Sequence, residues 1–150
     1  MRRGRRTEEP ANREGSAMDL ITVTRKDGLE FNIHVRGHDV TSDLSEKDGG
    51  RDRGASPVEL LGGCLGACIA VMVQGYCLRH GYDGDVGVSL TMELADKPKR
   101  IGRIVVDLEL PSGVPEDRIG AIKRVAQRCP IHETLKSPPG VDIDVVWAET

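Results

Sequence analysis

The stretch Ser56–His80, SPVELLGGCLGACIAVMVQGYCLRH, contains nineteen consecutive residues, 60–78, without a charged side chain. Four glycines and three of the four cysteines of the protein lie in this run. Just before it, Ser56, Pro57 and Glu59 supply an N-cap, a proline at the first helical position and a capping-box partner. The pattern predicts a long central helix. Because apolar residues occur all around it, the helix is expected to be buried on nearly every side.

The composition is that of an ordinary globular domain, with 38% hydrophobic and 30% charged residues. A net charge of −3 argues against nucleic-acid binding, and the basic runs at 2–6 and 97–103 lack aromatic residues for base stacking. No apolar signal-peptide core follows the basic start, so the cytoplasm is the expected compartment. Cysteines there are more often free, metal-bound or catalytic than disulfide-bonded.

The central run also reaches the roughly 17–25 residues that a transmembrane helix needs. Its glycines, Gln74 and the N-cap typical of soluble proteins argue against a membrane span. The half-apolar strands on either side of it would also have no core without this helix. We therefore expect no membrane association.

The segments before the helix predict a leader and three strands. Residues 1–17 are polar and read as a disordered leader, with Met18 as a candidate functional start. Strands are expected at 19–25 and 29–36, on either side of the hairpin signal Asp27-Gly28, and around 39–44. Residues 45–55 are expected to be a flexible loop. One domain is expected over residues 18–150.

After the helix, residues 86–94 and 104–110 alternate as two strands of a hairpin. A second helix is expected from Pro115 to Cys129, where Pro130 ends it. A final strand is expected over Val141–Trp147. The order βββ-α-ββ-α-β predicts an α+β fold with a mostly antiparallel sheet. One sheet face and one short helix cannot cover an all-round apolar helix, so we expect a homodimer that packs two central helices together.

The cysteines fall into two groups. At about 100° per residue, Cys64 and Cys68 lie about 40° apart on the central helix, while Cys77 lies about 180° from Cys68. Cys64 and Cys77 are expected to be small buried apolar side chains. If the second helix packs on the first, Cys68 and Cys129 would come within disulfide range, with Cα atoms about 4.4–6.8 Å apart. That pair is either a redox couple or two inert buried thiols.

Two motifs carry a family resemblance. SPVELLGGCLGAC (Ser56–Cys68) and AQRCPIHETL (Ala126–Leu135) together resemble the OsmC/Ohr family of peroxide-reducing proteins, and the resemblance extends over residues 18–149, including GHDVTSD from Gly37. It implies an OsmC-like fold, an intertwined homodimer with active sites at the subunit interface, and a thiol-dependent peroxidase without a cofactor. By motif position, Cys68 would attack the hydroperoxide and Cys129 would resolve the product, with an external thiol or dithiol as reductant.

The resemblance also implies an arginine near the attacking thiol and a glutamate that orients this arginine. Arg36 is the candidate for the arginine, and a solvated charge at the end of a strand is its alternative interpretation. The glutamate position of the organic-hydroperoxide branch is occupied by Val58, and Glu59 follows one residue later. Glu59 is therefore either catalytic or only the capping-box residue. The sequence looks closer to OsmC-like subgroups with P-x-E-L-L.

Other interpretations stay open at the level of sequence. Cys64, Cys68, Cys129 and His132 are four residues that could ligate zinc. A non-enzymatic member of the family would bind a small hydrophobic ligand between subunits, with His132 and Thr134 in the cleft or capping a turn. The pair Gly62 and Gly66 is expected to allow close approach of a neighbouring helix.

Overall fold

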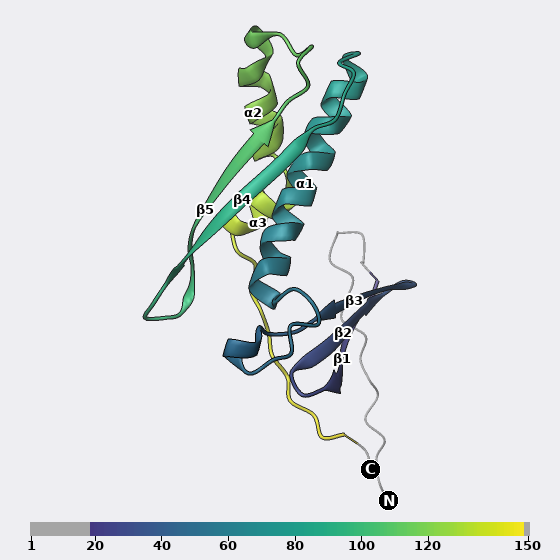
Figure 1. Cartoon of the computed structure of the whole chain (residues 1–150), viewed down its shortest axis with the longest axis vertical. Helices are drawn as coiled ribbons and strands as arrows, with labels where there is room; N and C mark the ends of the chain where they lie inside the picture. Colours follow the sequence, from purple (N-terminus) through teal and green to yellow (C-terminus); the bar gives the residue numbers. More distant parts are fainter. Residues whose placement is uncertain (1–18, 149–150) are drawn as a thin grey trace, which may run out of the picture. The chain divides into compact units, whose positions relative to one another are not determined.

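The computed structural model describes residues 19–148, and these form two compact units that divide after Gly54, each described here by itself (Figure 1). In chain order the elements are β1 (Ile21–Asp27), β2 (Glu30–Val35), β3 (His38–Ser42), the 3-10 helix η1 (Glu46–Asp48), α1 (Pro57–Arg79), β4 (Gly87–Ala95), β5 (Arg100–Glu109), the 3-10 helix η2 (Glu116–Arg118), α2 (Ile119–Gln127) and α3 (Pro130–Lys136). The α+β class is confirmed. The leader and Met18 lie outside the described residues, and the single domain stays a prediction.

The first unit contains an antiparallel sheet in the order β1-β2-β3. The predicted hairpin is confirmed, because Asp27 pairs with Glu30 and Gly28 has a positive φ of 51°. A second tight turn joins β2 to β3, where Arg36 also has a positive φ of 55° and the Gly37 N–H donates to the Val35 carbonyl at 3.0 Å. The three predicted strands of this unit are therefore present.

Helix α1 opens the second unit and begins as predicted. The Ser56 N–H donates to Glu59 Oε2 at 2.7 Å, and the Glu59 N–H donates to Ser56 Oγ at 3.3 Å. Both hydrogen bonds of a capping box are present, with Pro57 at the first helical position. The helix start follows directly from these three residues.

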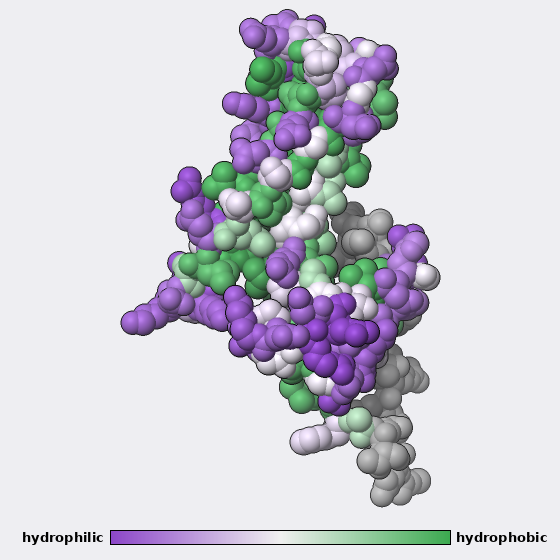
Figure 2. Space-filling model, in the orientation of Figure 1, coloured by the Kyte–Doolittle hydropathy of each residue, from purple (hydrophilic) through white to green (hydrophobic). Residues whose placement is uncertain are grey.

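Burial of α1 is one-sided. Leu65, Ile69 and Val73 are at most 7% exposed, whereas Val71 and Leu78 are 71% and 67% exposed. Hydrophobic side chains are visible at the surface of the part of the molecule that holds α1, β4 and β5 (Figure 2). The prediction that α1 is buried on nearly every side is thus wrong for the single chain, because the elements packed against the helix cover one side of it.

Among the described residues, α1 is the helix that is long and apolar enough to cross a membrane by length and composition. The core helix of a soluble protein meets the same criteria. The residues of α1 that form part of the core, such as Leu65 and Val73, are consistent with that second interpretation.

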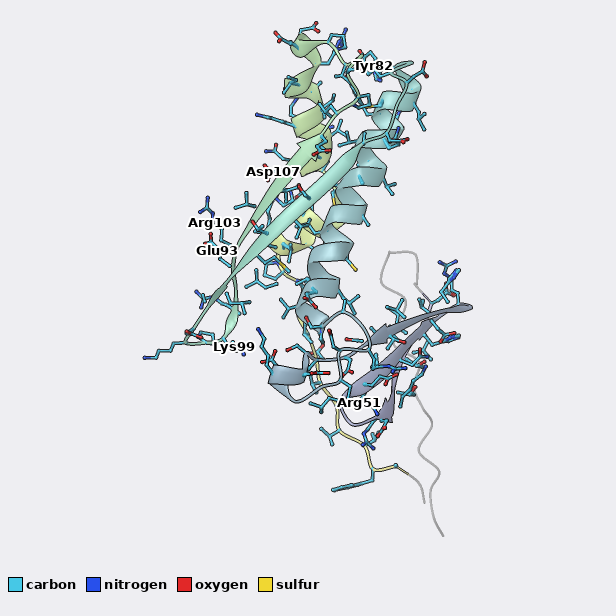
Figure 3. The ribbon with its side chains drawn as sticks, viewed as in Figure 1. Arg51, Tyr82, Glu93, Lys99, Arg103 and Asp107 are labelled. Carbon is cyan, nitrogen blue, oxygen red and sulfur yellow. The ribbon has the colours of Figure 1, made fainter. Side chains whose placement is uncertain are left out.

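Strands β4 and β5 form the predicted antiparallel hairpin, with Leu90 opposite Val106. Glu93 and Arg103, which also face each other, lie 3.8 Å apart as an exposed ion pair (Figure 3). A Cβ added at Gly62 would lie 2.8 Å from Met92 Cε and 3.1 Å from Leu90 Cδ1. The glycine side of α1 therefore packs on β4, and the expectation of a neighbouring helix there is wrong.

The segment after β5 holds more helix than predicted. Helix α2 ends at Gln127, close to the predicted end at Cys129, but Pro130 begins α3 with Cys129 as its N-cap residue. Proline was expected only to stop a helix here. It is equally suited to the first position of a new helix, because its missing N–H has no partner to lose there.

The predicted final strand is wrong. Residues 137–148, the end of the described part of the chain, form no strand, and Val141, Ile143, Val145 and Trp147 are 77–94% exposed. Alternation places the apolar side chains on one face of an extended segment. A β-strand also needs a neighbouring strand for its backbone hydrogen bonds, and the alternating pattern does not supply one. Within residues 19–148 this segment pairs with no such neighbour.

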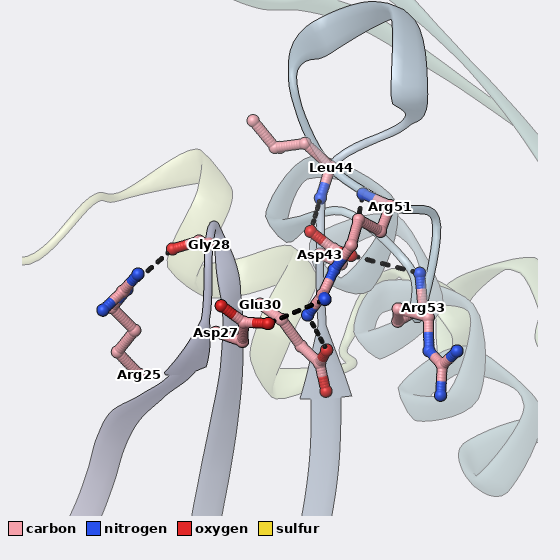
Figure 4. A network of polar contacts seen from close by, with 8 residues as sticks. All are labelled: Arg25, Asp27, Gly28, Glu30, Asp43, Leu44, Arg51 and Arg53. Carbon is pink, nitrogen blue, oxygen red and sulfur yellow. Dashed lines mark hydrogen bonds and ion pairs between the residues drawn. The ribbon is translucent and has the colours of Figure 1, made fainter.

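The predicted flexible loop at 45–55 is instead anchored to the sheet of its own unit (Figure 4). Asp43 is 2% exposed and accepts hydrogen bonds from the N–H groups of Leu44, Arg51 and Arg53 at 2.8, 3.1 and 3.2 Å. The Arg51 guanidinium contacts Asp27 and Glu30 at 2.7 and 3.1 Å, which ties the loop to the β1–β2 hairpin.

Candidate functional site

Two predicted site residues, Cys68 of α1 and Cys129 at the start of α3, meet in the second unit. Cys129 is fully buried, and Cys68 is half-buried and packs against the core that contains Cys129. A side-chain hydrogen bond joins the two thiol groups. All four cysteines are free thiols. The structure therefore brings this pair together in its reduced form.

The surroundings of Cys129 favour its protonated form. Burial raises the pKa of the Cys129 thiol, the hydrogen bond with Cys68 raises it further, and the backbone N–H groups of His132 and Ile131 act in the opposite direction. The Cys129 thiol therefore keeps its proton more readily than an ordinary cysteine does.

A cavity of about 510 Å³ lies between α1, β5, α2 and α3. Its lining is largely apolar and comprises Leu65, Ile69, Ile104, Val106, Asp107, Leu108, Leu110, Ile119, Ile122, Lys123, Ala126, Gln127, His132 and Leu135. Leu65 and Ile69 flank Cys68 in sequence on α1, and Ala126 and His132 each lie three residues from Cys129. The cavity is large enough for a small apolar molecule.

The two charged lining residues, Asp107 and Lys123, were not anticipated from the sequence. Asp107 lies on β5, where Figure 3 labels it, and Lys123 lies on α2. In the sequence, the one indication for Lys123 is its place directly after Ile122, a buried residue of the amphipathic helix α2.

Glu59 serves as the capping residue. Its pKa lies below the usual value, because the backbone N–H of Ser56 donates to the carboxylate and the Ser56 side chain interacts with it as well. Nine residues separate Glu59 from Cys68, which corresponds to about 13 Å along a helix axis. One chain therefore does not bring this carboxylate to the thiol, and a catalytic role for Glu59 stays a prediction.

Arg36 belongs to the first unit, where its Nε lies 3.8 Å from Asp19 Oδ2 and its side chain is 63% exposed. The predicted role of Arg36 beside the thiol stays a prediction. Within this unit, Arg36 has the surroundings of the alternative interpretation, a solvated charge at the end of a strand.

The other two cysteines differ from each other. Cys77 is fully buried, as predicted, and burial raises the pKa of its thiol. Cys64 is exposed, contrary to prediction, because it lies on the side of α1 that the sheet and helices leave uncovered. Within residues 19–148, no three His, Cys, Asp or Glu side chains come together as a possible metal site. The proposed ligand set of Cys64, Cys68, Cys129 and His132 is therefore not assembled.

The sequence profile of the OsmC-like protein family matches residues 48–144, which include α1, both cysteines and the cavity. The chain belongs to the OsmC-like protein family. No curated protein matches the sequence.

Solved structures of OsmC-like proteins share the fold. An OsmC-like protein from Mycoplasma pneumoniae is 20% identical, with 83% of this chain and 91% of that chain covered and a TM-score of 0.72. A Psychrobacter arcticus protein named for the osmotic stress and detoxification response is 16% identical, with coverages of 81% and 90% and a TM-score of 0.72. The organic hydroperoxide resistance protein OsmC of Legionella pneumophila is 15% identical, with coverages of 83% and 93% and a TM-score of 0.61.

Proposed function

We propose that this OsmC-like protein is a thiol-dependent peroxidase that reduces hydroperoxides through Cys68 and Cys129 and so contributes to oxidative-stress defence. The observation that carries the proposal is the hydrogen bond between a half-buried and a fully buried thiol. The name of the Legionella relative, an organic hydroperoxide resistance protein, agrees with it.

In the first step the Cys68 thiolate attacks one oxygen of the O–O bond. That bond breaks, the sulfur is oxidised to sulfenic acid, and the alcohol leaves. Cys68 suits this role because it is the more accessible member of the pair. Cys129 suits the resolving role because its thiol stays protonated and shielded until the sulfenic acid forms.

In the second step the Cys129 sulfur attacks the sulfenic sulfur of Cys68, which forms a disulfide and releases water. An external thiol or dithiol then reduces this disulfide by exchange. We expect the external thiol to attack the Cys68 sulfur of the disulfide, because Cys129 is fully buried. The largely apolar cavity between α1, β5, α2 and α3 favours a hydroperoxide with an apolar organic group over hydrogen peroxide.

The proposal is tested by following consumption of cumene hydroperoxide with dithiothreitol as reductant. Cys68→Ser should abolish consumption, and Cys129→Ser should lose sustained turnover. Cys77→Ala is the matched control, because it removes another buried thiol of the same core. Equal activity of the wild-type protein and Cys68→Ser would refute the proposal.

A second candidate function is binding of a small apolar ligand without chemistry, which the 510 Å³ cavity favours. This function predicts that wild-type protein binds cumyl alcohol but consumes no cumene hydroperoxide in the same assay. Calorimetry with cumyl alcohol, beside the consumption assay, separates the two functions.

We also propose that the working form is a homodimer in which α1 of each chain covers that of the other. The proposal rests on the exposed apolar side of α1, with Val71 and Leu78, and on the exposed apolar residues of the C-terminal segment 141–147. Surfaces of this kind mark interaction sites. Val71→Glu should convert a dimer to monomers in sedimentation experiments; a wild-type monomer at micromolar concentration would contradict the proposal.

A further inference from the structure

One side chain of the cavity, His132, is absent from the peroxidase steps described above. It lies on α3, is half-buried and lines the cavity. Its backbone N–H acts on the Cys129 sulfur, the same sulfur that is hydrogen-bonded to Cys68. The imidazole therefore belongs to a residue whose backbone N–H contacts the Cys129 sulfur.

The tautomer of His132 follows from its hydrogen bond. Nδ1 lies 2.9 Å from the backbone carbonyl oxygen of Gln127. A carbonyl oxygen only accepts, so Nδ1 must carry the hydrogen. Nε2 is then the ring atom left to accept a proton from, or donate one to, a molecule in the cavity.

The same hydrogen bond fixes the ring in place. Gln127 is the last residue of α2 and His132 is the third residue of α3, so the bond spans the turn that holds Cys129. Imidazole anchored through one nitrogen, with the other nitrogen available, is a common arrangement for proton transfer.

Hydroperoxide reduction needs such a group. Cleavage of the O–O bond by the Cys68 thiolate leaves an alkoxide, which is a strong base comparable to hydroxide. A proton delivered as the bond breaks removes this unfavourable charge from a largely apolar cavity.

We propose that His132 is a catalytic residue of the reduction, whose imidazolium Nε2–H gives its proton to the alkoxide that leaves when Cys68 cleaves the O–O bond. The proposal rests on the proposed peroxidase function. In balanced form, the Cys68 thiolate, the hydroperoxide and protonated His132 give the Cys68 sulfenic acid, the alcohol and neutral His132. Two electrons pass from sulfur to the O–O bond, and solvent reprotonates the ring.

Charged groups lie on three of the elements around this ring. Asp107 of β5 and Lys123 of α2 line the same cavity, and on α3 itself Glu133 and Lys136 are paired at 3.4 Å. All four belong in the interpretation of any pH profile of the reaction.

The test compares two oxidants in a single turnover, measured as loss of Cys68 thiol. Cumene hydroperoxide releases an alkoxide, whereas peracetic acid releases a carboxylate, whose pKa of about 4 means that it needs no proton. His132→Asn keeps a donor near Nδ1 for the Gln127 carbonyl and removes Nε2. His132→Gln places an amide near Nε2 that cannot supply the proton. His80→Asn is the control, since His80 bonds the Tyr76 carbonyl at 2.8 Å in the same way.

Both His132 variants should react with cumene hydroperoxide about 100-fold or more slowly, the usual effect of losing a general acid. Their rates with peracetic acid should stay close to wild type, and His80→Asn should match wild type with both oxidants. Equal slowing with both oxidants would assign His132 a purely structural role, and no slowing with either would also overturn the proposal. Failure of the peroxidase function itself would appear separately, as a wild-type protein whose Cys68 thiol is lost with neither oxidant.

Discussion

The thiols of Cys68 and Cys129 are hydrogen-bonded to each other, although the two residues lie 61 positions apart in sequence. One lies in the middle of the long helix α1, and the other lies between α2 and α3. A disulfide between these two residues is the oxidised form that we expect.

Removal of Cys129 should expose Cys68 to over-oxidation. In Cys129→Ser the sulfenic acid on Cys68 has no thiol partner, so excess hydroperoxide should carry it to sulfinic and sulfonic acid. Mass spectrometry of the peptide that contains Cys68 measures this. The wild-type protein and Cys77→Ala should stop at the disulfide; a wild-type protein that over-oxidises as readily as Cys129→Ser would show that Cys129 resolves nothing.

The capping box makes separate predictions for its two residues. Ser56→Ala should lower the free energy of unfolding by about 0.5–2 kcal/mol, because the Glu59 N–H loses its acceptor. Glu59→Gln keeps an oxygen for the Ser56 N–H and should cost less. Chemical denaturation measures both effects. Turnover of Glu59→Gln should stay near wild type; a loss of tenfold or more, about 1.4 kcal/mol, would assign Glu59 a role at the thiol.

Asp43 should make the protein sensitive to acid. Burial alone would raise its pKa, but hydrogen bonds from the backbone N–H groups of Arg53, Leu44 and Arg51 outweigh burial and leave the pKa below the ordinary 3.8. The ionised form is therefore the one that stabilises the fold. This contribution is fully present above pH 3.8 and is lost as the pH falls through the lower folded-state pKa.

Thermal melts across this acidic range check the effect of Asp43. Asp43→Asn should lower the stability at neutral pH and flatten its decline in acid. Asp142→Asn, a change of an exposed aspartate in the C-terminal segment, is the control and should leave both unchanged. If Asp43→Asn preserves the wild-type acid profile, the carboxylate does not hold the loop.

The glycines of α1 should respond differently to substitution. A Cβ at Gly63 would meet nothing within 4 Å, so Gly63→Ala should stabilise the helix by up to about 1 kcal/mol. A Cβ at Gly62 would crowd Met92 at 2.8 Å, so the gain should largely vanish in Gly62→Ala. Gly62→Val should destabilise by about 1–3 kcal/mol. Denaturation midpoints that rank Gly62→Ala above Gly63→Ala would contradict the packing of α1 on β4.

Elements with local signals were predictable from the sequence. The capping box fixes the start of α1, Asp27-Gly28 forms its hairpin, and period-two alternation identifies β4 and β5. Helix α3 was missed because proline permits a helix start as readily as it forces an end. The strand expected at 141–147 failed because strand formation depends on a partner that the alternating pattern does not contain.

The site was predictable only in part. The Cys68 and Cys129 pair could be named from two motifs, and its proximity follows from the packing of α2 and α3 on α1. His132 was a candidate for a ligand cleft, but the position of the cavity and the part of Lys123 in its lining could not be derived, because they depend on which sides of α2 and α3 face β5. The exposure of Cys64 could not be predicted either, because it depends on which elements cover which side of α1.

The most direct test of the central claim is mass spectrometry of reduced protein treated with one equivalent of cumene hydroperoxide. The account predicts a single disulfide that joins the peptides of Cys68 and Cys129, with Cys64 and Cys77 still free. Protein that leaves the hydroperoxide unconsumed, or that forms a disulfide through Cys64 or Cys77 instead, would contradict it.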